Sequence, residues 1–228
     1  MAYYFRRMRA EDVDQVTEID RESFPNQWPP ADYKHELHNR MARYIVVCDD
    51  EKTYDVTKLD TSTKSTGLTS RLRRWFSRSR SSVDDLLAPP AHYIIGFAGL
   101  WLMVDEAHIT NIAVRLAYQR RGLGELLLIS LINIAQELKA SIVTLEVRVS
   151  NTTAQGLYLK HGFNQTGIRQ GYYVDRGYQI DSREDGLVMS TEDITLDTFR
   201  TQLEKLKQAY LQKWGITSAQ IERWLSIQ

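Results

Sequence analysis

Apolar residues along this chain recur with two spacings, one typical of helices and one typical of strands. Segments 10–24 and 126–138 repeat apolar residues at the helical period, which predicts helices with one face packed on a sheet. Shorter helices are expected at 33–40 and 152–161. The expected strands are Tyr3 to Met8, Tyr44 to Cys48, Tyr93 to Val104, Ala107 to Val114, Ile142 to Val149, a run from Phe163, and Leu187 to Ser190. Strands interrupted by helices predict a mixed α/β sheet.

The turn after the strand Ala107 to Val114 has an unusual composition. Its sequence is Tyr118-Gln119-Arg120-Arg121-Gly122-Leu123-Gly124-Glu125, and a Leu-rich helix follows. The first amides of that helix have no partner within it and lie beside the positive end of its dipole. Two glycines let an anion approach the backbone closely, and two arginines add positive charge. This pattern predicts a pyrophosphate site; the alternative is a Gly-containing turn that only starts the helix.

The spacing of this turn excludes two commoner phosphate loops, because neither Gly-Lys-Ser/Thr nor Gly-x-Gly-x-x-Gly is present. Its Gln-x-x-Gly-x-Gly pattern resembles the acetyl-CoA pyrophosphate loop, Gln/Arg-x-x-Gly-x-Gly/Ala, of the GCN5-related N-acetyltransferase (GNAT) superfamily. The residues that follow resemble one branch of it, the ribosomal-protein-alanine N-acetyltransferases. The matching strings are Asn111-Ile112-Ala113-Val114, Leu145-Glu146-Val147-Arg148, Ser150-Asn151, Leu157-Tyr158, Gly162-Phe163-Asn164, Tyr172-Tyr173 and Arg183-Glu184-Asp185.

The resemblance implies a GNAT fold for residues 1–190, with helices flanking a mixed central sheet. An insert at about 52–90, rich in Ser, Thr and basic residues, is expected to be a flexible loop. That insert either has no role or offers a basic patch to ribosomal RNA, a partner or a membrane surface. Residues 191–228 are expected to form a helical extension, with a turn at Trp214 into a short last helix. This extension packs on the core or a second subunit, or it serves a dedicated partner.

Composition limits the classes of function. The chain has 228 residues, of which 43% are hydrophobic, enough for one domain with a sizeable core. Lys+Arg and Asp+Glu both number 29, so no overall charge bias indicates a nucleic-acid coat or a membrane-surface protein. No segment has the length of a membrane span or the pattern of a signal peptide, and a cytoplasmic location is expected. The single Cys48 is predicted to be a buried small hydrophobe rather than a nucleophile.

Acetyl transfer from a thioester to an amine needs a base for the amine and a proton for the departing thiolate. Strand alternation places Glu146 opposite the apolar face of its strand, where a carboxylate is costly unless it has a polar site or a partner. By resemblance Glu146 is the general base, and partial desolvation is expected to raise its basicity. The alternative is an ion pair with a nearby arginine such as Arg148. By resemblance Tyr158 is the general acid, and the alternative is a core tyrosine.

The resemblance also implies the remaining site residues. The residues expected to contact acetyl-CoA are Ile112, Ala113, Val114, Gln119, Arg120, Arg121, Gly122, Leu123, Gly124, Glu125, Asn151 and Tyr158. Of these, 112–114 hold the pantetheine as an added strand would, and Asn151 also caps the following helix. The acceptor pocket is expected at Trp28, Tyr172, Tyr173 and Glu184, with the tyrosines in a loop before the last strand. Those aromatics are alternatively ordinary surface cover. No metal is expected.

The resemblance implies an acetyl-CoA-dependent N-terminal α-acetyltransferase, acting by direct transfer on the N-terminal alanine of a small-subunit ribosomal protein. An α-amino group has a pKa of about 7.7–8.0 and is partly neutral in the cell, whereas a lysine near 10.4 needs more help. One alternative is a GNAT enzyme that acetylates a lysine side chain or a small-molecule amine. The other is a non-catalytic CoA-binding or ribosome-associated module.

Overall fold

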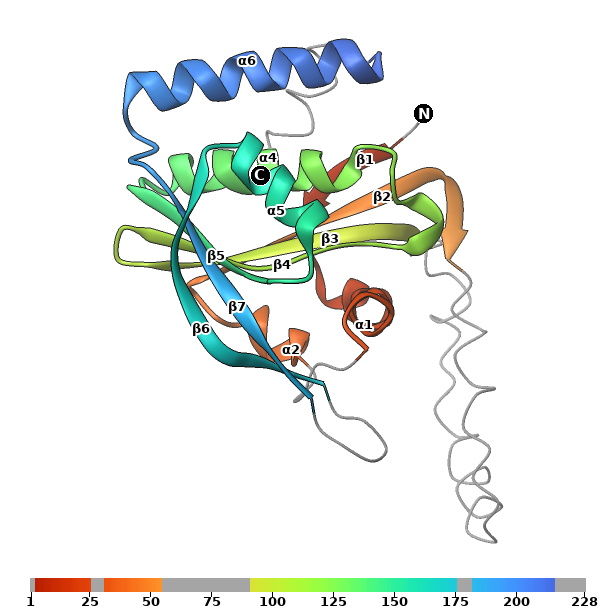
Figure 1. Ribbon diagram of the computed structural model, residues 1–228. Helices are drawn as coiled ribbons and strands as arrows, with labels where there is room; N and C mark the ends of the chain where they lie inside the picture. Colours follow the sequence, from red (N-terminus) through yellow and green to blue (C-terminus); the bar gives the residue numbers. More distant parts are fainter. Residues whose placement is uncertain (1–2, 26–30, 55–90, 176–181, 216–228) are drawn as a thin grey trace, which may run out of the picture.

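The computed structural model describes residues 3–25, 31–54, 91–175 and 182–215 of the chain. Within these ranges, one seven-stranded sheet has the order β1-β2-β3-β4-β5-β7-β6, and helices cover both of its faces (Figure 1). The strands are β1 Tyr3–Arg7, β2 Ala42–Tyr54, β3 Ala91–Met103, β4 Glu106–Val114, β5 Ile142–Arg148, β6 Phe163–Asp175 and β7 Ser182–Thr191. The helices are α1 Val13–Ser23, α2 Tyr33–Glu36, α4 Leu123–Glu137, α5 Thr152–Lys160 and α6 Asp197–Trp214, with short 3-10 helices η1 Ala10–Asp12 and η5 Leu116–Tyr118. The predicted mixed α/β sheet is confirmed.

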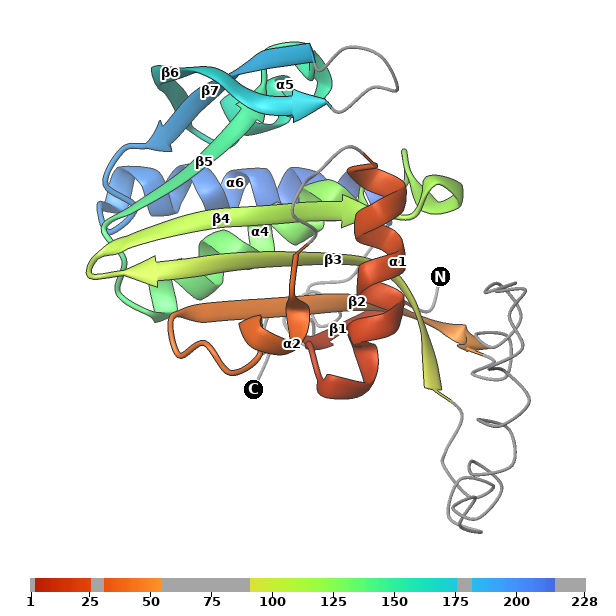
Figure 2. The same cartoon turned by 90° about the horizontal axis from the view of Figure 1, so that it is seen from below.

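Strands β4 and β5 form the parallel pair of this sheet, and they separate halfway along their length (Figure 2). Their pairing ends at Ile109 opposite Leu145. Beyond that point β4 stays paired with β3 as far as Val114, whereas β5 pairs with β7. In β4 the register with β3 shifts at Thr110, and such a bulge bends a strand and increases its twist. The β5-facing edge of 110–114 therefore has no strand partner among the described residues.

Helix α4 packs one side on the sheet, as predicted, and it is also buried on most of its other sides. Every residue from Leu126 to Ile132 is buried. One side of the helix covers the sheet, and α6 lies over the other (Figure 1). Leu203, Tyr210 and Leu211 of α6 belong to the same apolar cluster as α4. A helix that is apolar all round needs such cover on both sides, and here the tail supplies it.

Two aromatic residues of α6 cover turns at the ends of other helices. A Cβ on Gly122, which precedes α4, would lie 2.5 Å from the Trp214 indole. A Cβ on Gly162, which follows α5, would lie 3.2 Å from the Phe199 ring. Both glycines have positive φ, +80° and +84°. The Tyr210 hydroxyl also donates to the Gly122 carbonyl at 3.3 Å. Helix α6 thus braces the start of α4 and the end of α5 together.

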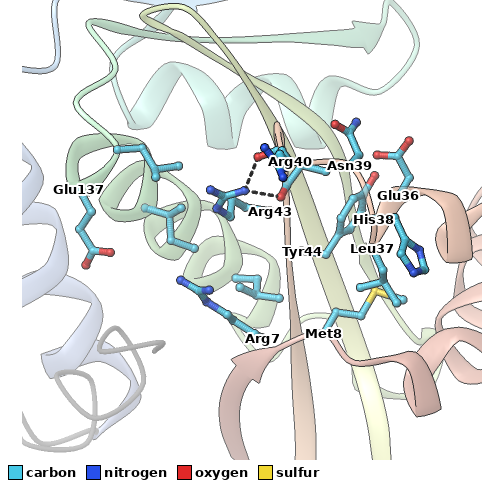
Figure 3. A pocket seen from close by; sticks show the side chains of 14 residues that line it. Arg7, Met8, Glu36, Leu37, His38, Asn39, Arg40, Arg43, Tyr44 and Glu137 are labelled. Carbon is cyan, nitrogen blue, oxygen red and sulfur yellow. Dashed lines mark hydrogen bonds between the residues drawn. The ribbon is translucent and has the colours of Figure 1, made fainter.

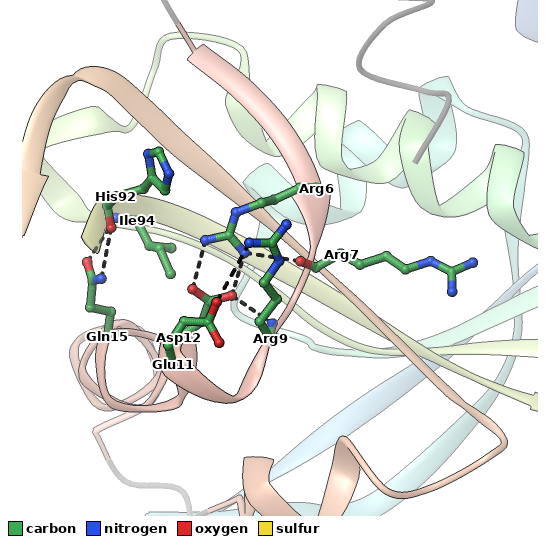
Figure 4. A network of polar contacts seen from close by, with 8 residues as sticks. All are labelled: Arg6, Arg7, Arg9, Glu11, Asp12, Gln15, His92 and Ile94. Atoms are coloured by element: carbon green, nitrogen blue, oxygen red, sulfur yellow. Dashed lines mark hydrogen bonds and ion pairs between the residues drawn. The ribbon is translucent and has the colours of Figure 1, made fainter. Parts of the chain in front are cut away.

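On the opposite face of the sheet, polar contacts attach the start of α1 to the strands (Figure 4). Asp12 is 2% exposed and accepts from the Arg6 guanidinium at 2.6 and 2.8 Å and from the Arg9 amide at 2.7 Å. The Gln15 side chain donates to the His92 carbonyl and accepts from the Ile94 amide, both at 2.9 Å. These contacts satisfy buried polar groups that would otherwise cost stability.

Several elements differ from those expected from the sequence. Strands β6 and β7 continue as a hairpin to Asp175 opposite Ser182, so the prediction that Tyr172 and Tyr173 lie in a loop was wrong. Strand β2 extends to Tyr54, into the predicted insert, and α2 is shorter than expected. Cys48 is fully buried in β2, as predicted. Trp28, the insert from residue 55 and the expected last helix lie outside the described residues, and the division at 190 stays a prediction.

Candidate active site

The turn before α4 presents a run of unpaired backbone amides. From Arg120 to Glu125, no amide donates a hydrogen bond to a described acceptor. The turn is built from two left-handed residues, Arg120 at φ +62° and Gly122 at φ +80°. No heavy atom of the described residues beyond its own helix turn lies within 4 Å of the place of a Cβ on Gly124, so this side of the turn is open. Amides at a helix N-terminus, beside an open face, fit an anionic group such as a diphosphate.

The side chains of the turn mostly stabilise the turn itself. Gln119 Nε2 donates to the Val114 carbonyl at 3.0 Å, at the end of β4. Arg121 donates to the Ala117 carbonyl at 3.0 Å and to the Tyr3 hydroxyl at 3.1 Å. These bonds fix the path of the backbone, which leaves the amides as the groups that face an anion.

Glu125 joins α4 to α5 in the structure. Its carboxylate forms an ion pair with Lys160 and lies 3.5 Å from His161 Nε2. A role for Glu125 and for the turn arginines in contacting acetyl-CoA stays a prediction.

Glu146 lies where β4 and β5 begin to separate, and two basic side chains hold it. It faces away from the apolar side of β5, as predicted, and its side chain is 7% exposed. His108 Nε2 lies 3.0 Å from one carboxylate oxygen, and Arg169 Nε lies 2.9 Å from the other. The hydrogen bond from His108 holds the pKa of Glu146 below its ordinary value, against the opposing effect of burial. The expected rise in its basicity was therefore wrong.

An ion pair of Glu146 with a nearby arginine, the predicted alternative, is present, but the arginine is Arg169. Arg148 pairs with Glu184 of β7, at 2.9 Å. Glu184 also accepts from the Ser150 amide at 2.7 Å. The hydrogen bonds from Ser150, followed by that from Arg148, lower the pKa of Glu184. Glu184 is thus a charged group that already has a partner, and it lies opposite Tyr173, near the last described pair of the β6–β7 hairpin. Its role in attracting an ammonium group stays a prediction.

Tyr158 projects from α5 beside the first residue of β6, with its ring 5.8 Å from that of Phe163. Asn151 caps α5, as predicted, by accepting from the Ala154 amide at 3.1 Å. The Tyr158 hydroxyl makes no hydrogen bond to a described residue, and burial raises its pKa to about 12. The phenol therefore keeps its proton at neutral pH and has it available for donation.

Tyr172 and Tyr173 lie near the candidate base Glu146, and Tyr173 is also near Tyr158. Their rings meet edge to face at 5.0 Å, and Arg148 lies 4.4 Å from the centre of the Tyr173 ring. Burial raises the pKa of Tyr173, and the nearby Tyr172, Glu146 and Tyr158 add to that effect. Since Tyr173 is in electrostatic contact with both Glu146 and Tyr158, the structure brings these groups to one region of the protein.

Sequence reasoning missed His108 and Arg169. His108 pairs with Thr144 across the parallel strands, two positions before Glu146. Arg169 reaches the same carboxylate from β6. Strand alternation would have placed His108 on the polar face of β4, but only the register of β4 against β5 shows that it meets Glu146.

A separate cavity of about 570 Å³ opens at the start of β2 (Figure 3). Arg7, Glu36, Arg43 and Glu137 are among its lining residues, and the site residues described above are not. Among the described residues, no group of three His, Cys, Asp or Glu side chains is placed to hold a metal ion. No described helix has both the length and the apolar character needed to cross a membrane.

Comparison with known proteins places these features in a family. The model of the acetyltransferase (GNAT) family matches residues 51–163. A Bacillus subtilis protein, provisionally named a ribosomal protein bS18-alanine N-acetyltransferase, is 34% identical over 185 residues, 81% of this chain and 91% of that protein. The ribosomal protein bS18-alanine N-acetyltransferase of Escherichia coli K12 is 43% identical over 94 residues, 41% of this chain and 61% of that protein.

Solved structures show the same fold. The crystal structure of the ribosomal-protein-S18-alanine N-acetyltransferase from Escherichia coli has a TM-score of 0.57 and 23% identity, and covers 83% of this chain and 93% of that one. Arabidopsis thaliana NAA60 in complex with acetyl-CoA has a TM-score of 0.57 and 16% identity, and covers 83% of this chain and 97% of that one. These likenesses confirm the fold that the sequence resemblance implied.

Proposed function

Because the chain belongs to the acetyltransferase (GNAT) family, we propose that it acetylates the N-terminal alanine of a small-subunit ribosomal protein, with acetyl-CoA as donor. The observation that carries this proposal is the position of Glu146, a carboxylate held where β4 leaves β5. On one side of it lie the free edge of β4 and the amides of the turn before α4. On the other side lie Tyr172 and Tyr173. A cytoplasmic location follows from a ribosomal substrate.

Donor binding uses backbone groups in this proposal. The amides from Arg120 to Glu125 receive the diphosphate of acetyl-CoA, because they have no described acceptor and Gly124 leaves room beside them. The free edge of 112–114 holds the pantetheine arm by main-chain hydrogen bonds, and one of its amides polarises the thioester carbonyl. The thioester then lies between Glu146 and Tyr158.

In the chemical step, the neutral amine of the peptide attacks the thioester carbonyl, so that a C–N bond forms and the C–S bond breaks. Glu146 accepts the proton that the nitrogen loses, directly or through a water. Tyr158 gives its phenolic proton to the departing sulfur and recovers a proton from solvent afterwards. The acceptor end is proposed to lie against Tyr172, Tyr173 and Glu184, with Trp28 opposite.

The proposal is tested by comparing turnover on an alanine-starting peptide, on the same peptide with a blocked N-terminus, and on free polyamines. Transfer to the free peptide and none to its blocked form supports an N-terminal acceptor. If the blocked peptide with an internal lysine, or a polyamine, is the better substrate, the protein is a GNAT enzyme that acetylates a lysine side chain or a small-molecule amine. If the wild-type protein binds CoA but acetylates none of these, the protein is a binding module.

Replacing Tyr158 with Phe is expected to lower kcat by about 10²-fold with little change in the affinity for acetyl-CoA, because only the proton donor for the sulfur is lost. The raised pKa of about 12 keeps the wild-type phenol protonated, so no Tyr158 limb should appear in the kcat profile between pH 6 and 10. Steady-state kinetics and calorimetric titration measure both quantities. Tyr54→Phe, at the end of β2, is the control, and equal losses in both variants would contradict the assigned role.

A further inference from the structure

Four polar side chains form a row across β4 and β5. Glu106 and His108 come from β4, and Thr144 and Glu146 come from β5. The parallel register pairs His108 with Thr144, and strand alternation puts all four on one face of the sheet. Ala107, which lies between the two β4 residues, points into the core. The row therefore ends at the carboxylate that we assign as the base.

The contacts along this row require a hydrogen on both ring nitrogens of His108, whereas a neutral imidazole carries only one. Thr144 Oγ1 lies 2.6 Å from Glu106 Oε1, and because the carboxylate only accepts, the hydroxyl must donate. The same Oγ1 lies 2.9 Å from His108 Nδ1, so that nitrogen carries a hydrogen and donates to the oxygen. His108 Nε2 then faces Glu146 Oε2 at 3.0 Å. A neutral imidazole would bring a lone pair against a carboxylate there, so this contact requires a second proton.

The two oxygens of Glu146 are held by partners of very different freedom. The His108 side chain is 19% exposed and sits on a central strand, fixed by Thr144. The Arg169 side chain is 57% exposed and reaches Oε1 from β6, near the sheet edge. Its guanidinium lies 5.4 Å from the ring centre of Tyr172, one of the proposed acceptor-site residues. A cation therefore already occupies Oε1 on the side from which the peptide amine would approach.

We propose that His108 is a doubly protonated positioning residue, the fixed partner of Glu146 Oε2, and that Arg169 is an exchangeable partner whose place at Oε1 the peptide amine takes. This inference rests on the proposed function and assigns the oxygen that receives the amine proton. The proton passes from the nitrogen to Oε1, while the existing proton stays between Oε2 and His108 Nε2. The Glu146 carboxylate gains one proton, and the charges of His108 and Glu106 do not change.

This arrangement also bears on which amines react. A carboxylate held between an imidazolium and a guanidinium is a weak base, so the acceptor must arrive already neutral. At neutral pH the neutral fractions of an α-amine, with a pKa of about 7.7–8.0, and of a lysine, near 10.4, differ by a factor on the order of 10². The row thereby favours peptide N-termini over lysine side chains. The expected preference falls when His108 is replaced.

Nitrogen NMR of the imidazole rings tests the protonation state without any turnover. In the wild-type protein at pH 7.5, both His108 nitrogens should give the shifts of an imidazolium. In Glu146→Gln, the ring should become neutral with its hydrogen on Nδ1, and in Thr144→Val the preference for Nδ1 should be lost. A neutral His108 ring in the wild-type protein would overturn the proposal, whether or not the protein acetylates a peptide.

Kinetics of His108→Gln and Arg169→Gln test the division of roles. His108→Gln should lower kcat by about 10-fold or more. It should also move the acid limb that Glu146 gives to the pH profile of kcat toward higher pH, because the hydrogen bond that most lowers the pKa of Glu146 is gone. Arg169 still opposes that shift, while Glu106 and the tyrosines Tyr172 and Tyr173 also face the group. Arg169→Gln should keep kcat within about threefold and lower KM for the peptide, because a competitor for Oε1 is removed.

Equal losses of kcat in these two variants, with an unmoved acid limb, would show that both residues are merely structural. Thermal melts of each variant separate such losses from unfolding, and Thr144→Val provides a milder disturbance of the same row. If the imidazolium is observed but no peptide is acetylated, the proposed function fails while the charge state of the row stands. If peptides are acetylated but His108 is neutral, only this inference fails.

Discussion

Replacing Glu146 with Gln is expected to lower kcat/KM for an alanine-starting peptide by about 10²- to 10⁴-fold, because the amide cannot accept the proton of the attacking amine. The affinity for acetyl-CoA should change little, since the proposed donor contacts lie on the turn before α4 and on the edge of β4. Initial rates with varied peptide and calorimetric titration with acetyl-CoA measure the two quantities.

The pH profile gives this prediction its sign. The pKa of Glu146 is lowered in the folded protein. The carboxylate is therefore ionised at every pH above the ordinary pKa of a carboxyl group, and it is protonated only when the pH falls below the lowered pKa. The rise in kcat/KM between pH 6 and 8 should therefore follow the amine of the peptide. Glu137→Gln, at the end of α4, is the matched control. Wild-type turnover in Glu146→Gln would remove the carboxylate from the mechanism.

Gly122→Ala is expected to lose both stability and acetyl-CoA binding. A non-glycine residue at φ +80° costs roughly 1–2 kcal/mol, and the new Cβ would lie 2.5 Å from the Trp214 indole, so the brace from α6 must also shift. Because the amides of this turn are the proposed diphosphate contacts, we expect an acetyl-CoA affinity lower by about 10-fold or more together with a lower melting temperature. Differential scanning calorimetry and titration measure the two effects.

Gly124→Ala is the matched control, two residues further along the same turn. Among the described residues outside its own helix turn, no heavy atom lies within 4 Å of its Cβ position, and Gly124 is inside α4, where Ala is more favourable by roughly 0.5–1 kcal/mol. The family pattern resembled by this turn accepts Gly or Ala there. We therefore expect a slightly higher melting temperature with acetyl-CoA binding retained. The same loss of acetyl-CoA binding in both variants would contradict the prediction that a Cβ is harmful at position 122 and tolerated at position 124.

Features that depend on neighbours along the chain could be predicted from the sequence. The turn at Gly122 follows from glycine spacing between a strand and a helix, and the outward direction of Glu146 follows from strand alternation. Contacts between distant segments could not be predicted in this way. His108 and Arg169 reach Glu146 only through the register of β4 with β5 and the course of β6.

Burial of both sides of α4 likewise could not be predicted from the spacing of its apolar residues. A helical stripe shows that a face is apolar, but it does not show how many surfaces will cover the helix. The expected loop at Tyr172 failed for a related reason, since a hairpin extends wherever two strands can continue to pair. In both cases the missing information is the position of a partner that is remote in the sequence.

The helix that follows the last strand has a consequence for anyone who wishes to shorten this protein. Leu203, Tyr210 and Leu211 share one apolar cluster with α4, whose residues from Leu126 to Ile132 have no solvent-facing side. Ending the chain before α6 would expose apolar side chains along α4, next to the turn that is proposed to bind acetyl-CoA. A shortened protein would then be expected to self-associate or precipitate, so its lost activity would report on colloidal behaviour rather than on catalysis.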